Sequence, residues 1–559
     1  MKKFIAVIII CLCSVPLYAA DPVVVATFES LGITWDRTGG EDGLCHVEYR
    51  VNGEEDWIDG HDLWWDSDDS EYRGSIVLLE PDTQYDIRLT TDGDQDDTVS
   101  GTTWSETFNV GTTVELDASS NSKLSISTSG SAGNYRLYTR TGGATIDGND
   151  SIDHGIFIDA NYIIIRGVTI RETTSDAISI GQGAHDIIIE DCDISAWGSG
   201  LPAGGTSGSS WADNGGIATE LWDGNNDRVI IQRNRIHDPY DDANSWCEPE
   251  SGSHPYGPSA INIPEVDGQW VIRYNSIYSA ATFFEDAIMY AETGNTHNNH
   301  DIYGNYIQGF WDDGIQIEGD NENIRIWNNF IVNTHHAFAM ASGVDDEAGP
   351  LYVFNNVAVS TEFDGWCGYN PGGLVKTGSS ANGAKYIYNN TMLYDAPQGE
   401  YDALGMHHGI GQNNMLELIS KNNILQTASG QDAIAGTCAS GCSHSYNLYY
   451  DVTDQTCTTC VHSTATFDGS QTYDITNQTG TVHVALTNTS DGYDDGVAIN
   501  NFMPTYEGTA PDAGAQEYGT TGFEVGVDAY DEEEQAAATG SISAGSGTIS
   551  AGSGSIAGQ

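Results

Sequence analysis

The sequence has very few basic side chains. Lys and Arg together number 19, against 81 Asp and Glu, and the formal net charge is −62. Nucleic-acid binding depends on clustered Lys and Arg that neutralise phosphates, so the composition argues against this class of function. An excess of acid suits solubility in saline surroundings. It also suits a surface that binds divalent cations, among which Ca²⁺ prefers several oxygen ligands.

Long apolar runs are also scarce. The exception is the N-terminus, where Lys2 and Lys3 precede an apolar run from Phe4 to Leu17. This pattern is typical of a secretory signal over residues 1–20 and predicts an exported protein, either secreted or held at the cell surface. No later run is long and apolar enough to span a bilayer, so a membrane-spanning segment is not expected.

Cysteine is sparse and concentrated late in the chain. After position 20 the cysteines are Cys45, Cys192, Cys247, Cys367, Cys438, Cys442, Cys457 and Cys460. The last four form C-x3-C and C-x2-C motifs, a spacing that would suit zinc in a cytosolic protein. In an exported chain, two disulfides that clamp one loop are favoured instead. Cys247 and Cys367 lie in polar insertions that contain Trp, and they are candidates for a third bridge.

Residues 21–108 differ in pattern from the rest of the chain. After a turn marked by proline, Tyr85, Ile87 and Leu89 alternate with polar residues, which predicts a strand with one buried face. The residues L-E-P-D-T-Q-Y before and within this strand, with Trp35 in an early strand, resemble a fibronectin type III domain. The resemblance implies a β-sandwich that serves as a spacer or binding module.

Two short patterns repeat between residues 109 and 520. The first is a turn with acidic and small residues that leads into apolar–polar–apolar alternation, as from Asp312 to Gly319. The second places an Asn before an apolar pair, at intervals of about 24 to 41 residues, which predicts a solenoid. These asparagines are Asn234, Asn275, Asn305, Asn329, Asn356, Asn390 and Asn423. We expect them to hydrogen-bond between stacked coils and to occupy left-handed turn conformations.

Over about four hundred residues, these features resemble the right-handed parallel β-helix of pectate-lyase-like proteins. The predicted fold class is therefore all-β: a right-handed parallel β-helix solenoid preceded by a small fibronectin type III-like β-sandwich. Residues 521–559 are acidic and then rich in Gly and Ser, which predicts a flexible tail. A second interpretation makes this tail an attachment strand that pairs with a partner.

Acidic residues recur at equivalent places in neighbouring coils. Asp286 lies in one such place, and Asp313 and Glu318 lie in the next, with Asp312 beside them. Coils stack about 4.8 Å apart, so these carboxylates should lie roughly 5–10 Å apart, the range used in glycoside hydrolysis. The simpler interpretation is that Asp176, Asp286 and Asp313 cap turns by accepting backbone N–H bonds, and we favour it for Asp176.

Lys376 is a lysine in a strand-like run of the repeat. The resemblance implies a role as base, because several β-helix polysaccharide lyases use Lys or Arg to remove the proton α to a uronate carboxylate, aided by Ca²⁺. A Lys beside acidic groups normally keeps a high pKa, which disfavours that role and favours a plain salt bridge. Arg325 is expected either to contact the substrate or to pair with Glu318.

Histidine doublets and tryptophans complete the set of candidate substrate-binding residues. His335 and His336 form one doublet, and His408 ends another. Successive strand residues point to opposite faces, so at most one ring of each doublet should reach the groove. Acid–base work, metal ligation and a structural role all remain open for these residues. Trp311 would suit stacking on a sugar.

The sequence supports two functions of different classes. The favoured one is a secreted, carbohydrate-active protein that binds and cleaves an extracellular polysaccharide along the β-helix face. Hydrolysis by paired carboxylates is favoured over Ca²⁺-assisted elimination, because a polyuronate would be repelled by so acidic a surface. The alternative is a non-catalytic cell-surface adhesin or extracellular assembly protein. The fold does not choose between them, because one solenoid can carry either function.

Overall fold

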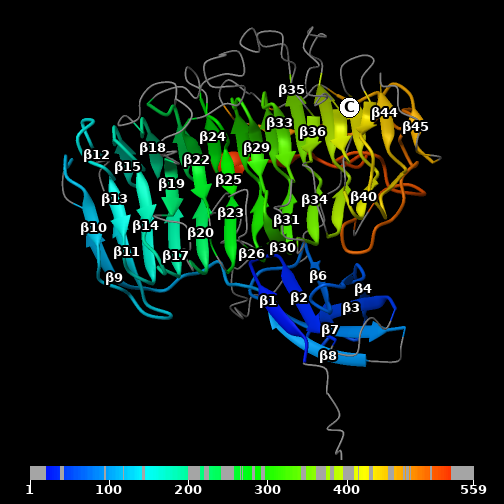
Figure 1. The fold of residues 1–559 in the computed structure, drawn as a ribbon, viewed down its shortest axis with the longest axis horizontal. Helices are drawn as coiled ribbons and strands as arrows, with labels where there is room; N and C mark the ends of the chain where they lie inside the picture. Colours follow the sequence, from blue (N-terminus) through cyan, green and yellow to red (C-terminus); the bar gives the residue numbers. More distant parts are fainter. Residues whose placement is uncertain are drawn as a thin grey trace, which may run out of the picture.

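The computed structural model shows an elongated β-solenoid with a small domain packed against one side (Figure 1). It describes residues 21–529 with gaps, the longest of which are 199–213, 241–256, 361–372 and 395–407. The predicted signal, the end of the predicted tail from residue 530 and the candidate bridge between Cys247 and Cys367 lie outside the described residues. Among the described residues there is no α-helix, and therefore no helix long and apolar enough to cross a membrane.

The small domain consists of two four-stranded antiparallel sheets. The first contains β1 (Val23–Ala26), β2 (Leu31–Asp36), β6 (Glu71–Ile76) and β5 (Trp64–Asp66), in that order. The second contains β4 (Ile58–Asp59), β3 (Cys45–Val51), β7 (Gln84–Thr91) and β8 (Asp96–Thr102). Tyr85, Ile87 and Leu89 are buried as their alternation predicts, and Trp35 lies in the same core. The predicted β-sandwich is confirmed.

The solenoid is built from three parallel sheets, which we call sheets 1 to 3. Sheet 1 contains β10 (Leu124–Ile126), β13 (Ile156–Ile158), β16 (Ile178–Ile180), β19 (Gly215–Thr219), β22 (Ser259–Ile263), β25 (Ile288–Tyr290), β29 (Asp313–Gln316), β33 (His336–Ala339), β36 (Gly373–Lys376), β39 (His408–Gly411) and β42 (Asp432–Ala435).

Sheet 2 contains β9 (Val110–Glu115), β11 (Tyr135–Thr139), β14 (Ile163–Arg166), β17 (Ile187–Glu190), β20 (Val229–Gln232), β23 (Trp270–Arg273), β27 (Asp301–Tyr303), β31 (Ile324–Trp327), β34 (Leu351–Phe354), β37 (Lys385–Tyr388), β40 (Leu418–Lys421) and β43 (Ser443–Ser445).

Sheet 3 contains β12 (Thr145–Asp147), β15 (Thr169–Arg171), β18 (Asp193–Ser195), β21 (Arg235–His237), β24 (Ser276–Tyr278), β28 (Tyr306–Gln308), β32 (Phe330–Val332), β35 (Val357–Ser360), β38 (Thr391–Tyr394), β41 (Ile424–Gln426), β44 (Leu448–Tyr450) and β45 (Val461–His462). The chain visits the three sheets in turn, so each coil adds one strand to each. Parallel pairing of this kind is the predicted β-helix.

The remaining elements are short. They are β26 (Thr296–Asn298) paired with β30 (Asp320–Glu322), β46 (Thr481–Val482) paired with β47 (Phe523–Glu524), and the 3-10 helix η3 (Gly526–Ala529). Inside the solenoid, isoleucines of successive coils stack into one continuous core. β-branched side chains suit this place because they pack well on a pleated surface.

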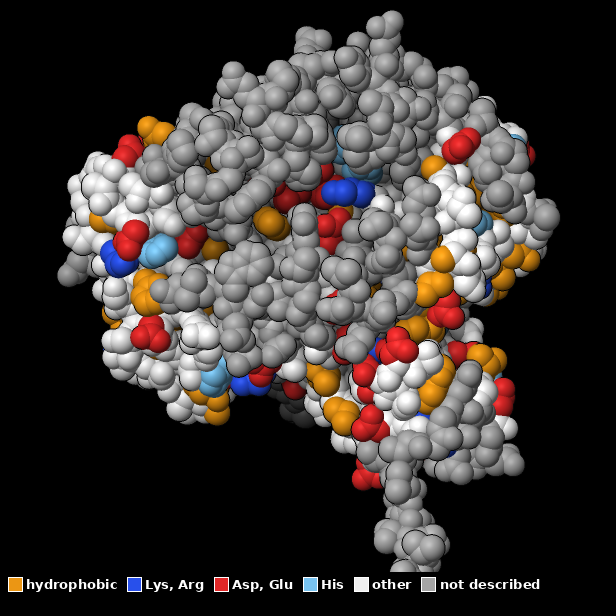
Figure 2. All heavy atoms as spheres, viewed as in Figure 1, with side chains coloured by type: hydrophobic (Ala, Val, Ile, Leu, Met, Phe, Trp, Pro, Cys, Tyr) orange, Lys and Arg blue, Asp and Glu red, His pale blue; other side chains and the backbone are white. Residues whose placement is uncertain are grey.

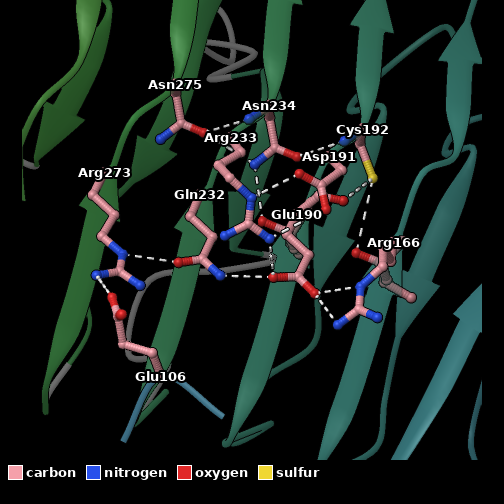
Figure 3. A network of polar contacts seen from close by, with 12 residues as sticks. Glu106, Arg166, Glu190, Asp191, Cys192, Gln232, Arg233, Asn234, Arg273 and Asn275 are labelled. Atoms are coloured by element: carbon pink, nitrogen blue, oxygen red, sulfur yellow. Dashed lines mark hydrogen bonds and ion pairs between the residues drawn. The ribbon is translucent and has the colours of Figure 1, made fainter. Parts of the chain in front are cut away.

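A ladder of asparagines runs along one corner of the solenoid. The amide Oδ1 of each Asn accepts from the backbone N–H and the side-chain amide of the Asn one coil earlier (Figure 3 shows the first step, from Asn234 to Asn275). The ladder continues through Asn305, Asn329, Asn356, Asn390, Asn423 and Asn447. The predicted stacking is confirmed. The predicted left-handed conformation is wrong for the ladder residues, because a positive φ falls on the residue before them, as at Asn328 and Asn355.

A second polar row crosses sheet 2. Glu190 accepts hydrogen bonds from Arg166 of the preceding coil and from Gln232 of the next, at 2.6 Å each. Arg273 continues the row to Gln232 and also contacts Glu106, in the segment that joins the sandwich to the solenoid (Figure 3). This row therefore links charged and polar side chains of four successive coils across sheet 2.

The sandwich is docked on sheet 2. Asp301 in the solenoid accepts hydrogen bonds from Thr27 of the sandwich and from Arg325, each at 2.5 Å. Arg73 of the sandwich is fully buried and pairs with Glu322 of β30 at 2.8 Å. Buried, charge-assisted contacts fix the position of a domain more firmly than exposed ones, since they are poorly screened by solvent.

Two disulfides close short loops near the end of the solenoid. Cys438 bonds to Cys442, and Cys457 bonds to Cys460. One bridge lies within the C-x3-C motif and the other within the C-x2-C motif, so the preference for disulfides over a zinc site is confirmed. Of the other described cysteines, Cys45 and Cys192 are buried and reduced.

Candidate functional site

The candidate site lies on three consecutive strands of sheet 1, β29, β33 and β36, near the middle of the solenoid (Figure 1). The register aligns Asp313 with His336 at the strand starts, and Ala339 with Lys376 at the strand ends. Gly314 follows Asp313 because a Cβ there would lie 2.9 Å from the backbone oxygen of Ala337, closer than a side chain permits. The tight approach of coils therefore brings the chemistry-bearing side chains together.

Lys376 is the centre of an ion cluster. Its Nζ donates to Asp313 Oδ2 at 2.9 Å, and it lies 3.7 Å from Glu318 Oε1 and 3.9 Å from Asp312 Oδ1. Its side chain is 23% exposed, whereas those of the three acids are 0–7% exposed. Lys376 is therefore the member of this group that faces outward most. In the space-filling view, acidic, basic and histidine side chains meet in the middle of the solenoid (Figure 2).

Asp286 joins the cluster from the preceding coil. Its Oδ1 accepts the backbone N–H of Asp313 at 2.7 Å. Asp286, Asp312 and Asp313 each offer an oxygen within 4.8 Å of the others. Asp286 thus caps the next turn, as the simpler interpretation expects, and also contributes a carboxylate to the cluster. Asp176 accepts the N–H of Gly215 in the same way, and no metal-ligand group among the described residues includes it.

Burial and mutual repulsion perturb the charges of the cluster. Burial, reinforced by Asp312 and Asp313, raises the pKa of Asp286 well above its usual range. Burial and Asp312 also raise the pKa of Asp313 to about 6, against the opposing effect of Lys376. For Lys376, burial acts to lower the pKa, but the carboxylates of Asp312, Asp313 and Glu318 outweigh it and raise the pKa well above normal. The cluster thus holds a firmly protonated Lys376 beside two acids, Asp286 and Asp313, whose pKa values are raised.

The histidine doublet departs from the prediction. His335 Nδ1 lies 3.7 Å from Asp312 Oδ1, and His336 Nδ1 lies 3.5 Å from Asp313 Oδ1. Both rings are buried and meet edge to face, with their centroids 4.3 Å apart. The expectation that the two rings point to opposite faces of a strand is wrong, because β33 begins at His336 and His335 belongs to the turn. Strand alternation applies only inside a strand.

Glu318 is held by a residue that the sequence reasoning missed. The side-chain amide of Gln316 donates to Glu318 Oε2 at 3.0 Å. Gln316 aligns with Met289 one coil earlier and Ala339 one coil later. Gln316 is a polar residue at a repeat position where the adjacent coils have apolar residues, and this difference could have identified it from the sequence.

The other predicted substrate-binding residues are Arg325, which lies on another sheet, Trp311, which is largely buried, and His408, which stays a prediction. Arg325 belongs to sheet 2, is fully buried and pairs with Asp301. Neither a substrate contact nor a pair with Glu318 fits this position, and the prediction for Arg325 is wrong. Trp311 is only 7% exposed, which leaves little of its ring for a sugar. His408 opens β39 and aligns with Gly373, so its backbone lies one coil beyond β36.

The acids fit a divalent cation. Asp286, Asp312 and Asp313 supply oxygen ligands, the type that Ca²⁺ takes, and Asp313 Oδ1 accepts no hydrogen bond from the described residues. A second set, formed by Asp312, His335 and His336, mixes nitrogen and oxygen and suits a transition metal better. The two sets share Asp312 and would compete for it. Burial and mutual repulsion raise the pKa values of Asp286 and Asp313, and a bound cation would favour the ionised forms of both.

No family model and no curated protein matches the chain. Among solved structures, it is similar to pectate lyase Pel9A, with 13% identity over 73% of this chain and 86% of that one, and a TM-score of 0.37. It is also similar to a family 28 exopolygalacturonase of Yersinia enterocolitica (9% identity, 80% and 99% covered, TM-score 0.28). A third is PfbA, a surface adhesin of Streptococcus pneumoniae (11% identity, 63% and 72% covered, TM-score 0.27). Similarity this distant assigns no activity.

Proposed function

We propose that this protein cleaves an acidic, uronate-containing polysaccharide by β-elimination, with Lys376 as the base. The observation that carries the proposal is the placement of Lys376 Nζ. It is the outermost group of a cluster whose other members are buried acids, 2.9 Å from Asp313. A hydrolase needs its two carboxylates to reach the substrate from either side, whereas here the acids lie behind the ammonium.

In this reaction Lys376 acts as the base, and neighbouring acids of the cluster orient it. In its neutral form Lys376 takes the proton on the carbon α to the uronate carboxylate, and the electron pair forms a carbon–carbon double bond. The glycosidic C–O bond to the neighbouring carbon breaks, and the leaving oxygen takes a proton from water. Asp313 and Glu318 orient the amine through the contacts at 2.9 and 3.7 Å.

The protonation state of Lys376 sets the condition for this chemistry. A base must be neutral, and the surrounding carboxylates hold its pKa well above normal. Asp286, Asp312 and Asp313 would hold Ca²⁺, which when bound would neutralise both these carboxylates and that of the substrate. When the negative charges of these acids are neutralised, they no longer raise the pKa of Lys376, and its neutral form becomes more populated. An acidic substrate is then no longer repelled.

The test is a polyuronate assay. Purified protein is incubated with polygalacturonate and with a glucuronate-containing polymer, with Ca²⁺ or with chelator. We expect ultraviolet absorbance from an unsaturated product in Ca²⁺ only. New reducing ends without absorbance would contradict elimination and support hydrolysis, for which Asp313, with its pKa of about 6, is the candidate proton donor beside Glu318. Tight binding with no product would support the adhesin.

We also propose that the protein acts outside the cell. The two disulfides near the end of the solenoid support this, because such bonds persist in oxidising surroundings. Residues 1–20 and the Gly- and Ser-rich tail would supply export and attachment. Mass spectrometry of the exported protein would test the first of these, and an N-terminus at Met1 would contradict cleavage after residue 20.

A further inference from the structure

A second candidate binding site lies between the two domains. A cavity of about 670 Å³ opens between β5 of the sandwich and strands β37 and β40 of sheet 2. Its volume falls within the range of ligand sites, roughly 300–1,000 Å³, and domain interfaces are common places for them. Sheet 2 is a different face of the solenoid from sheet 1, which carries the candidate functional site.

The walls of the cavity are aromatic. Trp64 and Trp65 come from the sandwich and are partly exposed, and Tyr386 and Tyr388 come from the solenoid. His61 packs against Tyr386 with ring centroids 4.7 Å apart and fixes that side of the wall. Aromatic rings of this kind present flat apolar faces with polar edges, which suit the alternating C–H and hydroxyl surfaces of sugars.

The charged groups that line the cavity differ in whether they have a described partner. Four acids line the cavity: Asp62, Asp66, Asp68 and Glu417. Asp62 lies 3.0 Å from His46, Asp66 pairs with buried Arg73 and accepts the backbone N–H of Asp68, and Glu417 accepts a hydrogen bond from Trp64 Nε1. Lys421 also lines the cavity, is half-buried, and forms no ion pair among the described residues. Burial lowers the pKa of Lys421. In a chain with 19 basic residues against 81 acids, an ammonium without a described counter-ion is an exception.

We propose that this cavity binds a sugar residue that carries a carboxylate. Lys421 pairs with the carboxylate, the ring of Trp64 covers the sugar face, and Glu417 accepts from its hydroxyl groups. A partly desolvated charge pair is stronger than an exposed one, so Lys421 selects acidic over neutral sugars. Binding in this cavity does not depend on whether Lys376 is catalytic. If the protein does cleave an acidic polysaccharide, the cavity would bind that same polysaccharide on a second face.

The experiment is a titration of the full-length protein with a galacturonic acid trisaccharide, followed by calorimetry and by tryptophan fluorescence. It is done at low salt with chelator, so that the cation-free acidic cluster around Lys376 repels the ligand. We expect one binding site in the wild type. Lys421→Gln should weaken binding at least about tenfold, and Lys421→Arg should stay within about threefold because the charge is kept.

The controls separate the two sites. Lys376→Arg should bind the trisaccharide as the wild type does, and a neutral galactose trisaccharide should bind at least about tenfold more weakly. Thermal melting of each variant shows that it is folded. No binding by the wild type, equal binding by Lys421→Gln, or loss of binding in Lys376→Arg would each overturn the proposal. None of these results bears on whether the protein cleaves a polyuronate in Ca²⁺.

Discussion

At the scale of single residues, the role of Lys376 can be separated from its charge. Arginine preserves the ion pairs with Asp313 and Glu318 but stays protonated at any working pH. We therefore expect Lys376→Arg to fold normally and to lose roughly 10²–10⁴-fold in kcat for elimination. Initial rates at saturating Ca²⁺ measure this. The matched control is Lys123→Arg, because Lys123 forms an exposed pair with Asp153 at 2.8 Å. A wild-type rate in Lys376→Arg would contradict the role of Lys376 as base and would mean that this residue only forms a salt bridge.

The acids predict a pH-dependent response to cations. The pKa of Asp313 in the folded protein is about 6, above its ordinary value of 3.8, so the folded state takes up a proton between these values. Stability from this group therefore falls as pH rises from about 4 to about 6. Because Ca²⁺ needs ionised ligands, it should raise the melting temperature more at pH 7.5 than at pH 5.

Differential scanning fluorimetry with Ca²⁺ measures this shift. Mg²⁺ at the same ionic strength controls for screening of the large net charge. Asp313→Asn should remove most of the Ca²⁺-induced shift, since it deletes a charged ligand. An equal shift at both pH values would argue against the cluster as the cation site.

Sequence analysis can predict that residues of the site lie close together only where they occupy equivalent positions of the repeat. Asp286, Asp313 and Glu318 occupy equivalent places in a repeat, and repeats stack, so their convergence follows from the sequence. Arg325 lies only a few residues further along, yet it is on another sheet. Its partner Asp301 precedes it by one coil, and which face of the coil a residue occupies depends on turn positions that a repeat pattern does not fix.

At the scale of elements, the asparagine ladder is the clearest case of a feature readable in advance. The steps between hydrogen-bonded asparagines, 41, 30, 24, 27, 34 and 33 residues, are the intervals of the sequence pattern. Asn447 extends the ladder by one more coil, and Leu448 and Tyr449 after it continue the same Asn–apolar pattern, although the predicted set ended at Asn423. The strand ends were less predictable, as the histidine doublet shows, since one residue decides between strand and turn.

The ladder yields a stability prediction. Asn329 accepts from the backbone and side-chain amides of Asn305, and it donates to Asn356. Asn329→Ala leaves several of these buried groups without partners, each costing about 1–3 kcal/mol, so we expect a loss of at least about 3 kcal/mol. Urea unfolding measures it. Asn328→Gly is the control, because Asn328 has a φ of 52° that glycine accepts readily. A loss below about 1 kcal/mol in Asn329→Ala would contradict the ladder's structural role.

At the scale of the complete chain, the sandwich and the solenoid act as one structure. The resemblance to a fibronectin type III domain implied a spacer, and a spacer would be joined by a linker with few contacts. Here Asn501, late in the chain, donates to the backbone oxygen of Val77 at 2.7 Å and to the hydroxyl of Tyr49 at 3.1 Å. The docking rests on pairs of residues hundreds of positions apart, which no local pattern reveals.

The docking can be weakened at one charge. Glu322 is the residue of the solenoid that pairs with Arg73 among the described ion pairs, and Gln at this position keeps the shape but loses the charge. We expect Glu322→Gln to weaken the docking by about 1–3 kcal/mol, since it removes the partner of Arg73 that lies on the solenoid and leaves, among the described ion pairs, only partners within the sandwich. Hydrogen exchange of the amides of β5 and β6 should then be about 10–100-fold faster, while the asparagine ladder keeps its protection. The control is Asp86→Asn, because Asp86 pairs with Arg50 on the outer sheet of the sandwich. Unchanged exchange in Glu322→Gln would mean that the aromatic contacts around His61 hold the domains together without this charge pair.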